Sequence, residues 1–226
     1  VSMNILSSKN DSFEEEDTMT QLGILLCDII RLPNADARVY KCKLAVVNLL
    51  MDAPPGYAHY LLLNGGIQPL ISILTLQATT LVVEQSRTNS VKDALTIVPI
   101  LAVLHKMCQA LPIVKDIIKV QIFPTVLEED EEYKLSAIQS DNVVSDSPNY
   151  CVPMNALDAS PGTLRWKLIK LMTWTDTSVK RCASELLWTL CNEDANEFVR
   201  RTGFGNAVHM LGIKGLVNLP SKSSTL

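Results

Sequence analysis

The chain has 226 residues, of which 47% are hydrophobic and only 5% aromatic, and its formal net charge is −4. This apolar content is enough for a substantial buried core, whereas the acidic balance argues against nucleic acid as a bulk electrostatic partner. The best candidate for a membrane span, Leu95 to Leu104, is ten residues long where about 20 are needed, so no membrane span is expected.

The six cysteines have no paired spacing and lie mostly within helical patterns. They are therefore expected to be reduced core thiols rather than a disulfide or zinc framework, which predicts a cytoplasmic protein. The sequence starts at Val1 with neither an initiating methionine nor the apolar region of a signal peptide, and we expect it to be the interior of a longer protein.

Residues 1–16 are polar and are expected to be disordered, whereas residues 17–127 are expected to form armadillo-like repeats. The first helix should end at Pro33, and the second should run from Asp36 to Met51 before Pro54-Pro55-Gly56 forces a turn. Each should bury one apolar stripe. The stripes are Leu22, Leu25, Leu26 and Ile29 in the first helix, and Tyr40, Leu44, Val47 and Met51 in the second.

A short helix, a break at Asn64-Gly65-Gly66 and a new helix follow, which is how armadillo repeats begin. The same kind of junction recurs around Gly203. Three repeats of about 46 residues would place Gly65 and Gly203 in phase, and armadillo and HEAT units have about 40 to 47 residues. Asn48 and Asn192 each lie near the end of the helix that precedes such a junction. We therefore expect roughly four repeats, the first of them incomplete.

The next pair of helices is predicted over Thr88 to Ala110 and Leu111 to Phe123, with Val91, Leu95, Val98 and Ala102 facing the core. The periodicity then stops. Residues 128–162 are acidic at first and then rich in Ser, Asp, Asn and Pro, and are expected to form a mobile loop. Its Ser145 to Pro148 segment has the pattern of a phosphorylation target. Residues 218–226 are expected to be a disordered tail.

Residues 163–217 are expected to form the C-terminal armadillo-like repeats, as four short helices with one apolar stripe each. Asp176 is a predicted N-cap, and Asp194 with Glu197 has the spacing of a capping box. Gly203 stands where a helix C-terminus favours a left-handed residue. The second of the four helices should bury Val179, Ala183, Leu186, Leu187 and Leu190.

The opposite face of that second helix carries four residues in line, namely Arg181, Glu185, Trp188 and Asn192. An exposed indole and an amide side by side would suit the binding of an extended peptide, because the ring supplies apolar area and the amide can both donate and accept. In the alternative interpretation, Trp188 is buried against the neighbouring repeat and Asn192 only ends its helix.

Positive charge is concentrated in residues 163–217, whereas the rest of the chain is acidic. The basic residues could form a strip along one surface, whose complement would be an acidic or carboxylate-bearing peptide. The alternative is a solvated basic face without a partner. The residues are Arg165, Lys167, Lys170, Lys180, Arg181, Arg200 and Arg201.

No catalytic constellation is recognisable. The histidines His59, His105 and His209 stand in separate predicted helices without a ligand-spaced partner, so structural or surface roles are expected rather than metal binding. Gly203-Phe204-Gly205 follows a helix rather than a strand, which is the wrong context for a phosphate loop. Neither a cofactor nor a catalytic residue is therefore expected.

The block from Arg165 to Leu216 resembles the C-terminal armadillo-type repeats of the Ric-8 (synembryn) family, most closely in KLIKLMT, DTSVKRCASELLWTLC and RRTGFGNAVHMLGIKGL. A weaker resemblance covers Leu95 to Pro124. The resemblance implies a cytosolic chaperone and guanine-nucleotide exchange factor for G-protein α subunits, which acts without covalent chemistry. It also implies further repeats before Val1 and an acidic, phosphorylatable tail after the last residue.

Together these observations predict an all-α, right-handed armadillo or HEAT-like solenoid that binds another protein. The resemblance implies that this partner is a G-protein α subunit, whose nucleotide-free state the solenoid favours. Recruitment to the cell cortex through the G protein is a further expectation. The expected protein-binding residues are Asn48, Arg165, Lys170, Lys180, Arg181, Trp188, Asn192, Arg200 and Arg201. The alternative is a passive armadillo or HEAT scaffold that binds an unrelated peptide and is indifferent to nucleotide.

Overall fold

The computed structural model describes residues 18–34, 36–84, 95–124 and 162–217, and within these ranges every regular element is a helix. A first helix covers residues 18–31. The helices that follow are α2 (Ala37–Asp52), α3 (Tyr57–Leu63), α4 (Ile67–Glu84), a 3-10 turn (Leu95–Ile97), α6 (Val98–Ala110), α7 (Pro112–Ile122), α9 (Leu164–Leu171), α10 (Thr177–Leu190), α11 (Ala195–Thr202) and α12 (Phe204–Ile213). The predicted all-α class is confirmed.

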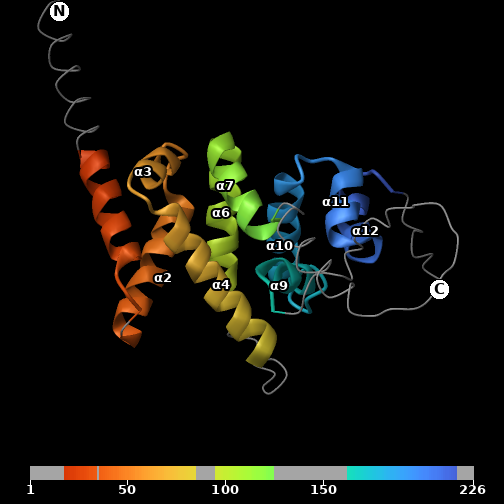
Figure 1. The fold of residues 1–226 in the computed structure, drawn as a ribbon, viewed down its shortest axis with the longest axis horizontal. Helices are drawn as coiled ribbons and strands as arrows, with labels where there is room; N and C mark the ends of the chain where they lie inside the picture. The colour runs from red at the N-terminus through yellow and green to blue at the C-terminus, as the bar shows by residue number, and fades with distance from the viewer. Residues whose placement is uncertain (1–17, 35, 85–94, 125–161, 218–226) are drawn as a thin grey trace, which may run out of the picture.

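The chain advances along the long axis of the molecule, from the first helix at one end to α12 at the other (Figure 1). Helix α6 packs against α2 on one side and against α10 on the other, so these three helices form a row. Helix α4 packs against α9 in the same way. Short helices α3 and α11 each lead directly into the helix that follows, and α3 meets α4 at an angle of 98°.

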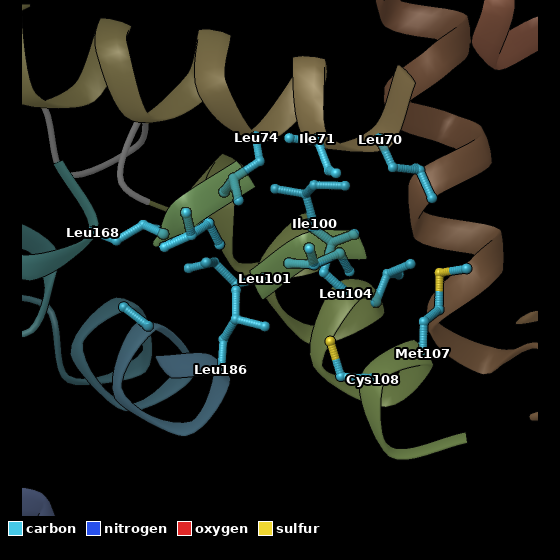
Figure 2. Packing of buried hydrophobic residues seen from close by; sticks show 14 of the residues in the cluster. Leu70, Ile71, Leu74, Ile100, Leu101, Leu104, Met107, Cys108, Leu168 and Leu186 are labelled. Atoms are coloured by element: carbon cyan, nitrogen blue, oxygen red, sulfur yellow. The ribbon is translucent and has the colours of Figure 1, made fainter. Parts of the chain in front are cut away.

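One continuous apolar core joins these elements. Leu70 and Leu74 of α4, Leu101 and Leu104 of α6, and Leu186 of α10 all converge on the interior (Figure 2), and each of them is fully buried. Burial of one such side chain stabilises the fold by about 1.5 to 3 kcal/mol relative to exposure. The core therefore holds α4, α6 and α10 to one another, although they are far apart in the sequence.

Local signals in the sequence set the ends of several helices. Asp176 is the N-cap of α10 and accepts hydrogen bonds from the backbone N–H groups of Ser178 (2.9 Å) and Val179 (3.0 Å), as predicted. Asp194 caps α11 by accepting from Glu197 N at 2.6 Å, but the Glu197 carboxylate bonds to arginines instead of completing a capping box. Gly203, at φ 83°, ends α11 and begins α12.

The buried faces of three helices differ from the predicted ones. In the first helix Leu26, Cys27 and Ile30 are buried, and the predicted burial of Leu22 and Leu25 is wrong, since both are exposed. In α2 Val47 is buried as expected, but Tyr40 and Leu44 are half-buried and Met51 is exposed. Val98 and Ala102 of α6 are only half-buried, because Ile100, Leu101 and Leu104 face the core instead.

The spacing of the repeats stays a prediction. Between Gly65 and Gly203 the described ranges hold α4, α6, α7, α9, α10 and α11, and residues 85–94 and 125–161 of this interval lie outside them.

Several predictions concern residues outside the described ranges. They are the disordered segment 1–16, the Thr88 end of the helix predicted to run to Ala110, the loop 128–162 up to residue 161 with its Ser145 to Pro148 segment and Cys151, and the disordered tail 218–226. Within the described ranges no single helix combines the length and the hydropathy of a membrane span, and only the sharply bent pair α3–α4 meets both criteria when taken together.

Candidate protein-binding surface

A shallow groove of about 350 Å³ lies between α6 and α10. Its lining residues are Ala102 and His105 of α6, and Arg181, Cys182 and Glu185 of α10. Arg181 and Glu185 stand four residues apart, so that they lie one turn above the other on the same face of α10. Ala102 is small, and the space beside it leaves a cation, a carboxylate and an imidazole accessible in one depression.

Two polar contacts fix the side chains of this groove. His105 Nε2 lies 3.0 Å from Thr189 Oγ1 and so links α6 to α10 across 84 residues of sequence. Lys214 Nζ, just after α12, donates to Glu185 Oε2 at 3.3 Å. Burial lowers the pKa of His105 from its ordinary value, with Glu185 acting against this shift and Lys214 adding to it. Burial likewise raises the pKa of the Cys182 thiol.

The predicted exposure of Trp188 is wrong. Only 4% of the residue is accessible, and its ring packs edge to face on Phe198 of α11, with 5.3 Å between ring centroids and 85° between ring planes. The alternative interpretation from the sequence, burial against the neighbouring helices, is the observed one. The indole is therefore part of the core. Of the predicted line, Arg181 and Asn192 are exposed and Glu185 is half-buried.

Asn192 is exposed, and it occupies a strained position directly after α10. Its φ of 56° and the φ of 60° at Glu193 are both in the left-handed region, which asparagine tolerates better than most residues. Lys115 Nζ of α7 donates to Asn192 Oδ1 at 2.9 Å. The amide thus joins two helices while its other face remains accessible. Asn48, its predicted counterpart, is exposed on α2.

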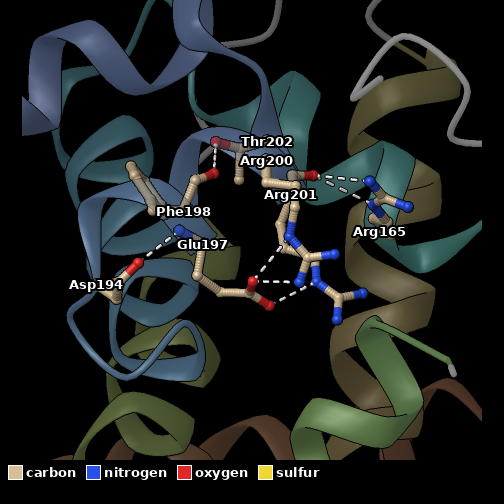
Figure 3. Close-up of polar contacts among 7 residues, drawn as sticks. All are labelled: Arg165, Asp194, Glu197, Phe198, Arg200, Arg201 and Thr202. Carbon is tan, nitrogen blue, oxygen red and sulfur yellow. Dashed lines mark hydrogen bonds and ion pairs between the residues drawn. The ribbon is translucent and has the colours of Figure 1, made fainter. Parts of the chain in front are cut away.

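A second cationic feature is the arginine cluster formed by Arg165, Arg200 and Arg201 (Figure 3). Arg200 and Arg201 both bond to the Glu197 carboxylate, the latter at 2.8 Å. Arg165 donates to the backbone carbonyl of Arg201 at 2.9 Å. The guanidinium carbons of Arg165 and Arg201 lie 5.8 and 5.3 Å from the centroid of the Phe123 ring. Burial acts to raise the pKa of Glu197, but the hydrogen bonds from the two arginines outweigh it and lower that pKa.

The residues of the predicted basic strip occupy different environments. Lys167 is buried and donates to Thr79 Oγ1 of α4 at 2.8 Å, so its predicted place on the surface is wrong. Lys170 is exposed and lies over the Trp166 ring, 5.6 Å from its centroid. Lys180 is half-buried on α10, and Arg181 lines the groove. These residues therefore do not form one continuous basic strip. Arg181 belongs to the groove, and Arg165, Arg200 and Arg201 belong to the arginine cluster.

Two members of the site could not be predicted from the sequence. His105 lies in α6 and Phe123 directly follows α7, and each meets its partners only through tertiary packing. No residue spacing signals such a contact.

In the described ranges no three His, Cys, Asp or Glu side chains are grouped as a metal site, and His59 and His209 are exposed on α3 and α12.

Comparison with known proteins identifies the C-terminal part of the chain. Residues 155–225 match the family described as guanine nucleotide exchange factor synembryn, Ric8. Over these residues the chain is similar to the Ric-8 family. It is similar to the chaperone Ric-8A of Xenopus laevis (53% identical over 55 residues), of Gallus gallus (51% over 55) and of Mus musculus (50% over 54).

Each of these alignments covers 24% of this chain and about a tenth of the length of the Ric-8A protein. The Ric-8 match includes α9 to α12, and with them Arg181, Glu185 and the arginines at 165, 200 and 201. Ala102 and His105, the α6 side of the groove, lie outside the matched residues.

Proposed function

We propose that this chain is part of a chaperone and guanine-nucleotide exchange factor that binds G-protein α subunits. The observation that carries the proposal is the match of residues 155–225 to the Ric-8 family, together with 50 to 53% identity to chaperone Ric-8A proteins over 54 to 55 residues. The groove between α6 and α10 is the proposed contact surface, because it presents Arg181 and polar side chains on two rigid helices. Asn192 and Asn48 extend the same proposal along the exposed sides of α10 and α2.

We propose further that the helices form a right-handed armadillo-like solenoid, with repeats over residues 17–127 and 163–217. The row made by α2, α6 and α10 supports this arrangement, because equivalent helices of a solenoid stack against one another. Trp188 is not included in the binding face.

The proposed mechanism is differential binding without covalent chemistry. A groove that holds the nucleotide-free or partly folded α subunit more tightly than the GDP-bound form lowers the free energy of the empty state. GDP then leaves more readily and GTP enters. In the cell we propose a cytoplasmic protein that is brought to the cortex by the α subunit it binds.

The test combines binding with exchange. The affinity of the purified chain is measured for one α subunit in its nucleotide-free, GDP-bound and GTP-bound forms, together with the rate of GDP release. Preference for the nucleotide-free form is the expected result. Equal affinity for all three forms would favour the passive scaffold, and no binding by the folded chain would exclude the proposal for these residues.

Arg181→Ala locates the contact. We expect the variant to associate more slowly with the α subunit, because a charge at the edge of a contact attracts its partner at long range. The difference in association rate should shrink as salt is added, since such charges are screened within about 8 Å at physiological ionic strength. The matched control is Arg38→Ala, whose side chain is 90% exposed at the start of α2 and lines no part of the groove. Equal effects of the two substitutions would remove the groove from the contact.

A further inference from the structure

His105 is placed to respond to charge in the groove. It faces the depression from α6, and its Nε2 is held 3.0 Å from Thr189 Oγ1. The other lining groups are a guanidinium, a carboxylate, a thiol and a methyl group. Imidazole is the side chain whose ordinary titration lies closest to neutral pH, so it is the group of this set that can change charge under mild conditions.

We propose that His105 makes the binding of a carboxylate-bearing partner in the groove dependent on pH, by taking up a proton when that partner is bound and acting as a second cation beside Arg181. The inference rests on the proposed function, since the partner concerned is the G-protein α subunit. It adds a regulation of the same groove.

Burial keeps the ring of His105 neutral in the free protein, although Glu185 and Glu193 favour its protonated form. Arg181 and Glu185 of α10 share the groove with it, Glu193 lies beyond the end of α10, and Lys214 approaches from α12. Burial dominates these influences and lowers the pKa of the imidazole. The neighbouring thiol of Cys182 stays uncharged, because burial raises its pKa from a value that is already basic.

A bound carboxylate reverses this balance. A negative charge within about 4 to 6 Å favours the protonated imidazole. Because the complex then binds a proton that the free groove does not, its affinity must rise as the pH falls toward the pKa of the free histidine. The contact with Thr189 survives the change, since an imidazolium donates from both nitrogens and a hydroxyl oxygen can accept. The response therefore needs no rearrangement of α6 against α10.

The experiment measures the dissociation constant of the nucleotide-free α subunit from about pH 7.5 to about pH 5.5, the interval in which an imidazole titrates. The chains compared are the wild type, His105→Gln and the control His59→Gln, whose histidine is exposed on α3 away from the groove. Glutamine keeps a side-chain donor and acceptor for Thr189 but carries no titratable group. Ratios between chains at each pH cancel any titration of the α subunit itself.

We expect the affinity of the wild type, relative to His105→Gln, to rise by about twofold to fivefold over this interval, the range of an exposed charge pair. His59→Gln should follow the wild type. Titration calorimetry in two buffers of different ionisation enthalpy should show more proton uptake on binding by the wild type near pH 6 than by His105→Gln.

The outcomes separate the two proposals. Binding by the wild type with a pH profile equal to that of His105→Gln overturns the role of His105 and leaves the proposed function intact. Loss of proton uptake in His59→Gln as well would place the titrating group elsewhere. Absence of any binding at all pH values by a chain that circular dichroism shows to be folded overturns the proposed function, and this inference with it.

Discussion

Trp188 shows what hydrophobic periodicity cannot reveal about a single residue. The apolar stripe through Leu186 and Leu190 is visible in the sequence, and both leucines are fully buried. Trp188 lies off that stripe, but Phe198 of the next helix covers it. The pattern of one helix reports its own apolar side, and the contribution of a neighbour from another helix depends on the fold.

Trp188→Ala is expected to lower the free energy of unfolding by about 3 to 5 kcal/mol, because it leaves a cavity beside Phe198 and removes the edge-to-face contact. Trp188→Phe should cost less, since it retains an aromatic ring. Urea unfolding followed by circular dichroism measures both. A variant with normal stability but weakened binding to the α subunit would show that the indole contacts the partner after all.

At the scale of elements, the ends of helices could be predicted better than their buried faces. Asp176 and Gly203 act through hydrogen bonds and backbone angles of their immediate neighbours, so a short stretch of sequence contains the whole cause. The first helix is apolar on a wide face, and its sequence alone does not decide that Leu26 and Ile30 are covered while Leu25 remains 56% exposed.

Gly203→Ala tests the joint between α11 and α12. At φ 83° and ψ 144° the backbone is in a region that only glycine occupies without strain, so alanine is expected to destabilise the chain by about 1 to 3 kcal/mol. The control is Gly205→Ala, inside α12, where an added Cβ meets no atom within 4 Å. That change should be neutral or stabilising, because alanine favours a helix. Thermal unfolding of both variants decides, and equal melting temperatures would contradict the strain argument.

For the whole molecule, the all-helical class followed from the sequence, but the groove did not. It is formed by α6 and α10, whose linking contact spans 84 residues. The number of repeats between Gly65 and Gly203 stays a prediction, since residues 85–94 and 125–161 lie outside the described ranges. Spacing in sequence measures repeats only where nothing is inserted into them.

Stability should depend on pH through Glu197, whose bonds to Arg200 and Arg201 lower its pKa in the folded chain. The unfolded chain then takes up a proton first as the pH falls, so this stabilisation is complete above the ordinary pKa of 4.5 and is lost as the pH drops through the lower folded value. The pKa of His105 is also lowered, from 6.5, so its contribution to stability is likewise lost as the pH falls, but over a higher pH range. Urea unfolding as a function of pH should show that the free energy of unfolding falls less steeply in acid for Glu197→Gln than for the wild type. His105→Gln identifies the part of the loss at higher pH that belongs to the histidine. Identical profiles for Glu197→Gln and the wild type would contradict a role of Glu197 in acid stability.

Helix α10 packs against α6, α7, α9 and α12, and Asp176 caps its first turn. Its groove residues therefore project from a backbone that is already fixed before any partner arrives. Ordering entropy on this side of a complex is confined to a few side-chain rotamers such as those of Arg181. We expect the conformational change that accompanies association to occur in the bound protein. Helix α10 then serves as a rigid template, and the more flexible partner adapts its conformation to it.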